Sequence, residues 1–258
     1  MKTPIKMIAT DLDGTLLRTD KTISSRTKKT LLRCQQQGIK LVYATGRAGS
    51  ALSLAETQYF DGCAIANGAI ALVGDTAAED TIIYKQLIPY KDARPLLLAC
   101  DKRGLKMSTQ HGGMDYSNFA MSDIWPEVTK FTLTDFAKHD KDAEKIFTYN
   151  LTAEDIAFIE SYMPPNSYMV VAIDGVAMIS HKEAKKSKAV AALAQYWGIA
   201  QSEIIAFGDD LNDIDLLAYA GKGIAMENAV AGAKNIADFI CPSNDEDGLA
   251  QWLETNVL

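Results

Sequence analysis

The sequence predicts an α/β protein whose parallel-sheet core is interrupted by an α+β segment. Apolar runs typical of buried strands alternate with helical patterns toward both ends of the chain, and this alternation favours parallel strands joined by helices. In the middle of the chain, strand-like runs follow one another directly and are mixed with helical stretches. We therefore expect one core domain formed by residues 1–83 and 183–258, with residues 84–182 inserted as a second, α+β domain.

The individual elements follow from apolar periodicity and from residues that begin or end helices. The first core segment should hold a strand over 5–10, a helix over 24–37, a strand over 39–44, a helix over 48–59 and a strand over 63–67. The insert should hold a helix over 92–104, a turn-rich stretch over 110–119, a strand over 145–151, a helix over 152–163 and a hairpin of 167–173 with 175–180 around Asp174-Gly175. The second core segment should hold a helix over 187–198, a strand over 203–210, a helix over 213–220 and strands over 221–226 and 238–243.

The composition is that of a folded, acidic protein. The chain has 258 residues, a formal net charge of −7 and 48% hydrophobic residues. An acidic chain without a long basic stretch lacks the charge that binds a nucleic-acid backbone, so we expect no nucleic-acid partner. We also expect a cytoplasmic protein without membrane association, because the sequence has neither a signal-peptide pattern nor an apolar run long enough to cross a bilayer. The four cysteines are widely separated, which disfavours zinc sites and a disulfide framework.

Polar residues follow three of the expected core strands. Asp11 and Asp13 follow the first strand, Thr45 follows the second and Asn67 ends the third. Because the carboxyl ends of parallel strands meet at one edge of a sheet, these residues are expected to form a single site. Asp11 and Asp13 are one residue apart, so their carboxylates could project together, and a divalent cation or a proton would relieve their repulsion.

A second acidic turn, GDDLND at 208–213, follows an apolar strand of the second core segment. It holds more carboxylates than helix capping requires. If both acidic turns lie on adjacent strand ends, they form an oxygen-rich pocket suited to Mg²⁺. Donors for phosphoryl oxygens would be Thr45, the backbone N–H groups of Gly46 and Arg47, and a lysine of the 182–188 stretch.

Other kinds of site are disfavoured by their own residue patterns. A calcium loop starting at Asp11 would need a glycine and a glutamate at positions where the chain has neither. The SNDEDG stretch at 243–248 has partial calcium-loop spacing, but a serine replaces the first carboxylate, and Ser243 with Glu246 matches a capping box. The fingerprints of dinucleotide-binding and Walker-type NTPase folds do not occur in the sequence.

Taken together, the core motifs resemble those of the haloacid dehalogenase superfamily. They are DLDGTL at 11–16, ATGR at 44–47, a lysine in KKSK at 185–188 and GDDLND at 208–213. NGA at 67–69, AGKGIAMENA at 220–229 and SNDEDG at 243–248 are similar to the Cof-type branch, the sugar-phosphate phosphatases with a type IIB cap. The resemblance covers nearly all of both core segments. It implies a Rossmann-like core domain with an inserted cap that determines substrate specificity.

This resemblance also implies a role for each matching residue. Asp11 would be the nucleophile, and Asp13 the general acid and base. Mg²⁺ would be bound by the Asp11 side chain, the Asp13 backbone carbonyl and Asp209, with support from Asp213. The implied phosphate-binding groups are the Leu12 amide, Thr45, Gly46, Lys186 and Asn212.

Three lysines, Lys185, Lys186 and Lys188, compete for the third motif. In the branch that the chain resembles, a Gly-Ile pair follows this lysine at a fixed distance. Lys186 keeps that register with Gly198 and Ile199. Because Ser187 replaces the glycine that usually follows the lysine, Lys188 stays open as the alternative.

We therefore expect a Mg²⁺-dependent phosphatase that hydrolyses small phosphorylated metabolites through an aspartyl-phosphate intermediate. The alternatives are phosphoryl transfer of the phosphomutase type and a noncatalytic metabolite-binding protein. The presence of both Asp11 and Asp13 favours catalysis. Sugar phosphates, pyridoxal phosphate and flavin mononucleotide are all open as substrates, and the oligomeric state is open as well. Polar residues of the insert are candidates for substrate contacts: His111, Asp115, Tyr116 and Asn118.

Overall fold

The computed structural model describes residues 4–47, 59–74, 81–126, 128, 130–171 and 175–258. The chain forms two compact units. The first consists of Met1–Lys85 and Lys185–Leu258, and the second consists of Gln86–Ala184. The second unit therefore begins and ends two residues after the insert that the sequence predicts. Each helix in the described part of the chain is too short or too polar to span a membrane.

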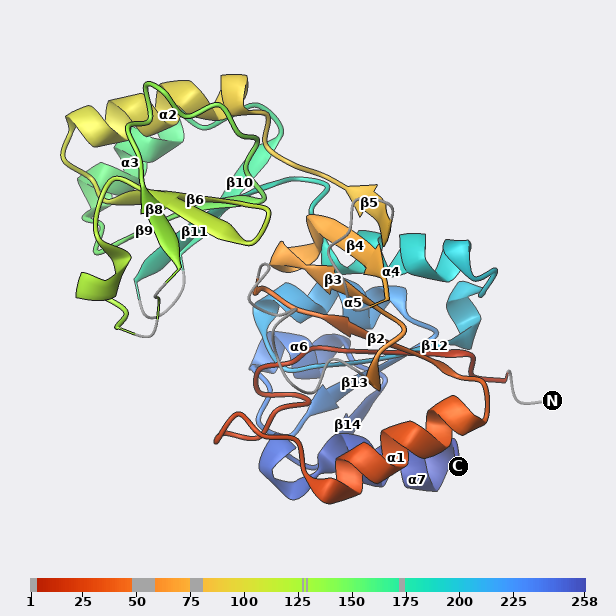
Figure 1. The fold of residues 1–258 in the computed structure, drawn as a ribbon. Helices are drawn as coiled ribbons and strands as arrows, with labels where there is room; N and C mark the ends of the chain where they lie inside the picture. Colours follow the sequence, from red (N-terminus) through yellow and green to blue (C-terminus); the bar gives the residue numbers. More distant parts are fainter. Residues whose placement is uncertain (1–3, 48–58, 75–80, 127, 129, 172–174) are drawn as a thin grey trace. The chain divides into compact units, whose positions relative to one another are not determined.

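The first unit is built on one sheet of eight strands. The strands are β1 (Met7–Thr10), β2 (Lys40–Ala44), β3 (Gly62–Ile65), β4 (Ile70–Val73), β5 (Ile82–Lys85), β12 (Ile204–Gly208), β13 (Lys222–Met226) and β14 (Phe239–Cys241). Their order is β14-β13-β12-β1-β2-β3-β4-β5 (Figure 1). Neighbours from β14 to β3 are parallel, whereas β4 pairs antiparallel with β3 and β5. The expected α/β fold with a parallel core is therefore confirmed.

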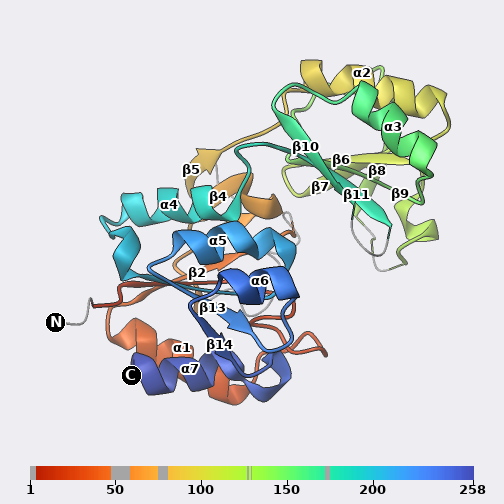
Figure 2. The ribbon, with the colours of Figure 1, turned by 180° about the vertical axis from the view of Figure 1, so that it is seen from behind.

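Helices cover both faces of this sheet. α1 (Ser25–Gln36) and α7 (Gly248–Asn256) lie side by side on one face. α4 (Lys186–Tyr196), α5 (Ile214–Tyr219) and α6 (Ala231–Ile236) lie on the other face (Figures 1 and 2). Because both faces are covered, every residue of β1 is buried, which explains the continuous apolar run in the sequence.

Local residues set the ends of α1 as the sequence predicts. The Ser24 side chain accepts a hydrogen bond from the Thr27 backbone N–H at 3.0 Å and so caps the first turn. Gly38 follows the helix with a φ of 79°, a left-handed conformation that glycine adopts without a steric penalty. The helix expected over 24–37 is therefore confirmed to within one residue at each end.

In its described residues, the second unit has a six-stranded sheet and two α-helices. Its elements are α2 (Tyr90–Lys102), β6 (Met107–His111), β7 (Met114–Ser117), β8 (Phe131–Leu133), β9 (Lys145–Tyr149), α3 (Ala153–Ser161), β10 (Ser167–Val171) and β11 (Val176–His181). The strand order is β10-β11-β9-β6-β7-β8, and all neighbours are antiparallel except β7 and β8. This unit has the α+β character that the sequence predicts.

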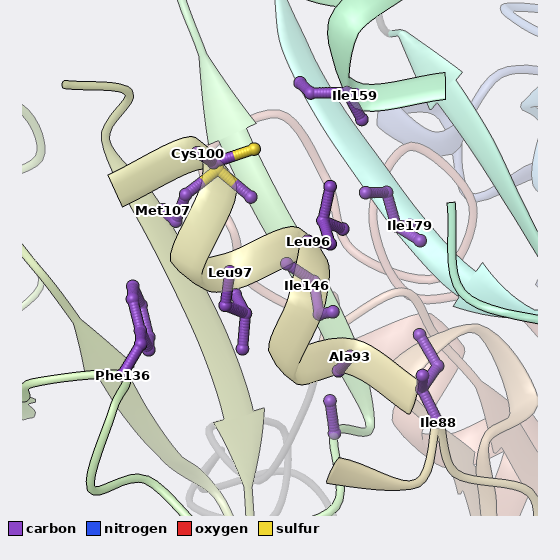
Figure 3. Close-up of a cluster of buried hydrophobic side chains, with 11 residues drawn as sticks. Ile88, Ala93, Leu96, Leu97, Cys100, Met107, Phe136, Ile146, Ile159 and Ile179 are labelled. Atoms are coloured by element: carbon purple, nitrogen blue, oxygen red, sulfur yellow. The ribbon is translucent and has the colours of Figure 1, made fainter. Parts of the chain in front are cut away.

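One face of this second sheet packs against its two helices. Leu96 and Leu97 of α2 meet Ile146 of β9, Ile159 of α3 and Ile179 of β11 in a buried apolar cluster (Figure 3). Fully burying side chains of this size stabilises a fold by roughly 1.5–3 kcal/mol each. The cluster gives the second unit a hydrophobic core of its own.

Several elements differ from those that the sequence predicts. The turn-rich stretch over 110–119 contains the end of β6 and all of β7, which reverse direction through Gly112 and Gly113. β4 and β5 were not expected at all. The expected hairpin strands pair antiparallel as β10 and β11, while its turn residue Asp174 lies outside the described residues. Nearly all of the helix expected over 48–59 also lies outside them.

Candidate functional site

Three adjacent strands bring the predicted site residues to one edge of the first sheet. β1 lies between β12 and β2, and all three run parallel. Asp11, Thr45 and Asp209 each follow directly after one of these strands. Leu12, whose amide is a predicted phosphate donor, is buried beside Asp11. The structure therefore unites residues that are up to two hundred positions apart in the sequence.

Asp11, Asp209 and Asp213 form a compact group of carboxylates. One oxygen from each side chain lies within 4.8 Å of the others. Asp11 is 5% exposed and Asp213 is completely buried. Three carboxylate oxygens at this spacing fit a hard divalent cation such as Mg²⁺, which prefers oxygen ligands. The described residues thus contain a site whose chemistry suits the predicted metal.

The backbone around this group leaves little room for other side chains. Asp213 Oδ2 accepts hydrogen bonds from the backbone N–H groups of Asp209 and Asp210, both at 3.0 Å. A β-carbon on Gly208 would lie 2.5 Å from the Asp213 Cβ. Gly14, with a φ of 78°, lies so close to the Asp209 carboxylate that a β-carbon there would collide with it. Gly14 therefore allows the two acidic turns to approach each other, and Gly208 allows Asp213 to pack against its own turn.

Lys186 lies within this acidic group. Its Nζ is 2.6 Å from Asp11 Oδ1 and 2.5 Å from Asp213 Oδ1, and the residue is 1% exposed. A buried ammonium requires such partners, because an unpaired charge in a protein interior is strongly unfavourable. Lys188, the alternative for the third motif, is exposed. The geometry thus brings Lys186, and not Lys188, to the predicted nucleophile.

The start of α4 fixes the position of Lys186. Lys186 is the first residue of the helix, and the next backbone N–H, that of Ser187, donates to Asp215 Oδ2 at 2.9 Å. Gly68 packs directly against the Lys185 carbonyl, where a β-carbon would overlap the backbone. Because Gly68 also has a φ of 86°, glycine is the residue that suits this contact.

The buried charges of this group influence one another. Burial raises the pKa of Asp11 to about 8, against the opposing effect of Lys186. Burial also raises the pKa of Asp209 to about 6, although Thr15 donates a 2.6 Å hydrogen bond to it. Burial alone would lower the pKa of Lys186, but the charges of Asp11 and Asp213 outweigh this effect and raise it. The lysine therefore stays charged, and protons compete with a cation for the carboxylates.

The Asp13 carboxylate has cationic partners of its own. Arg47 Nε and Nη2 donate to its Oδ2 and Oδ1 at 2.7 and 2.6 Å, and Lys21 Nζ lies 2.9 Å from Oδ1. Burial would raise the pKa of Asp13, but these hydrogen bonds lower it. The sequence suggested that a divalent cation or a proton would relieve the repulsion between Asp11 and Asp13. In the structure the two carboxylates have separate cationic partners, which are Lys186 for Asp11 and Arg47 with Lys21 for Asp13.

Three of the predicted phosphate-binding residues meet around Asn67: Thr45, Gly46 and Asn212. Thr45 is buried, and its side-chain oxygen accepts a 3.1 Å hydrogen bond from the Arg47 backbone N–H. Asn212 Nδ2 donates to Asn67 Oδ1 at 3.0 Å. A β-carbon on Gly46 would lie 2.9 Å from the same Asn67 oxygen, so this turn is closely packed. The roles of these residues toward phosphate remain predictions.

Two side chains at the site were missed by the sequence interpretation. Arg47 was considered only for its backbone N–H, and Lys21 was not considered. For Arg47 a signal existed, because it follows Thr45 at the same strand end. For Lys21 no local pattern indicates a contact with Asp13, since the contact depends on a turn held by residues near the C-terminus.

Comparisons with known proteins agree with this geometry. The family model of haloacid dehalogenase-like hydrolases matches residues 8–253. The 5-amino-6-(5-phospho-D-ribitylamino)uracil phosphatase YitU of Bacillus subtilis is 28% identical over 265 residues, which cover 98% of each chain. Phosphatase YwpJ of the same organism is 27% identical, over 97% of this chain and 99% of the relative. These names confirm the predicted class of enzyme, a phosphatase.

Solved structures show the same fold. BT1666 of Bacteroides thetaiotaomicron, studied among the phosphatases of the haloalkanoate (HAD) superfamily, has a TM-score of 0.84 and 26% identity, over 99% of this chain and 96% of that chain. The subclass IIB sugar phosphatase BT4131 has a TM-score of 0.81 at 24% identity, over 97% and 98% of the two chains, and this likeness shows the fold. The chain therefore belongs to the family of haloacid dehalogenase-like hydrolases.

Proposed function

We propose that this protein is a Mg²⁺-dependent phosphatase that hydrolyses small phosphorylated metabolites through an aspartyl-phosphate on Asp11. The observation that carries the proposal is the buried group in which Lys186 lies against Asp11 and Asp213, with an Asp209 oxygen within 4.8 Å of an oxygen from each of these carboxylates. Such a group offers a nucleophile, oxygen ligands and a fixed positive charge in one place. In this proposal the second unit selects the substrate.

In the first step, the Asp11 carboxylate attacks the phosphorus of a phosphate ester. The bond from phosphorus to the leaving oxygen breaks, and Asp13 gives that oxygen a proton. In the second step, water attacks the phosphorus of the aspartyl-phosphate while Asp13 takes a proton from the water. The bond between Asp11 and phosphorus then breaks, inorganic phosphate leaves, and both aspartates return to their starting states.

The surrounding groups support these steps in different ways. Lys186 neutralises charge beside the nucleophile, and the turn of Thr45 and Gly46, together with Asn212, supplies donors for phosphoryl oxygens. Mg²⁺ held by Asp11, Asp209 and Asp213, together with the Asp13 carbonyl, would stabilise negative charge on the phosphoryl group.

The hydrogen bonds to Asp13 favour its charged form, which suits the acceptance of a proton from water. The first step instead needs a proton on Asp13. We therefore expect the negative charge of a bound substrate to favour the protonated form of Asp13 while Lys21 keeps the carboxyl in place.

A screen of phosphorylated metabolites tests the proposal. The panel includes sugar phosphates, pyridoxal phosphate, flavin mononucleotide and the phosphoribitylaminouracil that names the relative YitU. Phosphate release with Mg²⁺ that stops with chelator is expected. Asp11→Asn should keep the fold, as judged by circular dichroism, and lose turnover. A folded Asp11→Asn variant with wild-type turnover would refute Asp11 as the nucleophile.

A further inference from the structure

A short turn after the first acidic motif presents a lysine to Asp13. The Arg18 backbone N–H donates to the Thr22 carbonyl at 2.9 Å, and the Lys21 N–H donates back to the Arg18 carbonyl at 2.8 Å. Lys21 sits at the tip with a φ of 65°, in the left-handed region. From there its Nζ lies 2.9 Å from Asp13 Oδ1. The turn thus places an ammonium beside the proposed acid and base.

The C-terminal SNDEDG stretch binds the residues that lead into this turn. Asn244 Nδ2 donates to the Leu17 carbonyl at 2.9 Å. The Thr19 backbone N–H and side-chain hydroxyl donate to the two oxygens of Asp245 at 2.8 and 2.7 Å.

Arg18, which lies between Leu17 and Thr19, is held in the same way, because its Nη2 donates to Asp247 Oδ1 at 2.8 Å. Three consecutive residues are therefore each bound by a side chain of one distant stretch. This contact explains the carboxylates that gave the stretch its partial calcium-loop spacing.

The energies indicate that the lysine contact does not serve folding. Lys21 is 61% exposed at its side chain, and an exposed ion pair contributes roughly 0–1 kcal/mol. The left-handed conformation costs a non-glycine residue about 1–2 kcal/mol, so the two terms cancel at best. Strained positions of this kind concentrate at functional sites. What the contact does provide is a second anchor for the Asp13 carboxylate beside Arg47.

We propose that Lys21 is a positioning residue that orients the Asp13 carboxylate, and that Asn244, Asp245 and Asp247 hold the turn that presents it. The proposal rests on the proposed function, because it requires that Asp13 donates a proton to the leaving oxygen. Its consequence is that residues near the C-terminus affect proton transfer without touching the substrate.

The test compares two esters that differ in their need for a general acid. An alkyl phosphate that the wild-type protein hydrolyses has a poor leaving group, whereas the leaving group of p-nitrophenyl phosphate needs little protonation. Lys21→Asn removes the ammonium and keeps a residue that tolerates the left-handed region. We expect kcat/KM to fall about tenfold for the alkyl ester and less than about threefold for p-nitrophenyl phosphate. The melting temperature should stay equal or rise.

A double-mutant cycle tests the role of the C-terminal stretch. Asp245→Asn should also lower kcat/KM more for the alkyl ester than for p-nitrophenyl phosphate. The double variant with Lys21→Asn should have a kcat/KM no lower than that of Lys21→Asn alone. Glu254→Gln is the matched control. It breaks the 2.6 Å ion pair between Arg26 of α1 and Glu254 of α7, a contact that also joins the N-terminal segment to the C-terminal one. This control should keep wild-type activity on both esters.

Equal losses on both esters, or no loss with Lys21→Asn, would overturn the positioning role. Additive losses in the cycle would show that Asp245 does not act through Lys21. If the wild-type protein releases phosphate from none of the phosphorylated metabolites in the screen and from neither ester, the proposed function itself fails and the positioning role with it. If the wild type is active and Asp11→Asn is inactive, the proposed function stands whatever Lys21→Asn shows.

Discussion

Replacing Lys186 by methionine should affect both stability and turnover. The side chain is almost fully buried and its ammonium lies within 2.6 Å of two carboxylates, so Lys186→Met leaves buried negative charge without a partner. Breaking a buried ion pair in this way costs about 3–5 kcal/mol. The cost should be largest above pH 8 with chelator. It should shrink toward pH 6, because Asp11, whose pKa is raised to about 8, then takes up a proton.

The same substitution should lower kcat by roughly 100- to 1,000-fold, the usual effect of losing one group that stabilises transition-state charge. Urea unfolding at the two pH values measures the first effect, and phosphate release measures the second. Lys188→Met is the matched control, since Lys188 is an exposed residue on the same helix. If Lys188→Met lost turnover while Lys186→Met kept it, the assignment of the third-motif lysine would be wrong.

Three further outcomes follow from the site. The Mg²⁺ concentration that gives half-maximal activity should rise roughly tenfold for each pH unit below pH 8, because a proton competes with Mg²⁺ for Asp11. A half-maximal concentration that does not change with pH would contradict this competition. With chelator present, the free energy of unfolding should increase as the pH falls from 8 to 6. The raised pKa values of Asp11 and Asp209 mean that the folded chain binds more protons than the unfolded chain in this range. A free energy of unfolding that decreases over this range in urea titrations would refute the reasoning. Gly68→Ala should destabilise the folded protein by more than about 3 kcal/mol, and Gly74→Ala by about 1–2 kcal/mol. Both glycines have a positive φ, but only Gly68 packs against the Lys185 backbone. Equal losses of stability in thermal unfolding would contradict the importance of this contact.

The sequence predicts which residues come together where each of them directly follows a strand. Asp11, Thr45 and Asp209 follow buried apolar runs, and the parallel order of those runs is enough to bring them together. The register of the family that the chain resembles favoured Lys186 and left Lys188 open, and the structure shows Lys186 at Asp11.

Prediction failed where polar residues are buried or where contacts link distant loops. Ser108 and Thr109 of β6 are buried although they are polar, so the apolar alternation that marks a strand is missing there. The bonds of Arg47 and Lys21 to Asp13 depend on the directions of two turns, which periodicity does not encode. Local sequence patterns also do not indicate the hydrogen bonds between SNDEDG and residues 17–19.

The pairing of β1 with β12 has a consequence for synthesis on the ribosome. Met7 lies opposite Ile204, so the first strand to emerge has one open edge until almost four-fifths of the chain has been made. The second unit, with its own apolar cluster, is completed before that partner appears. Asp11 likewise lacks its contacts with Lys186 and Asp213 until those residues have been made, so a truncated nascent chain carries an exposed strand edge and an incomplete acidic group.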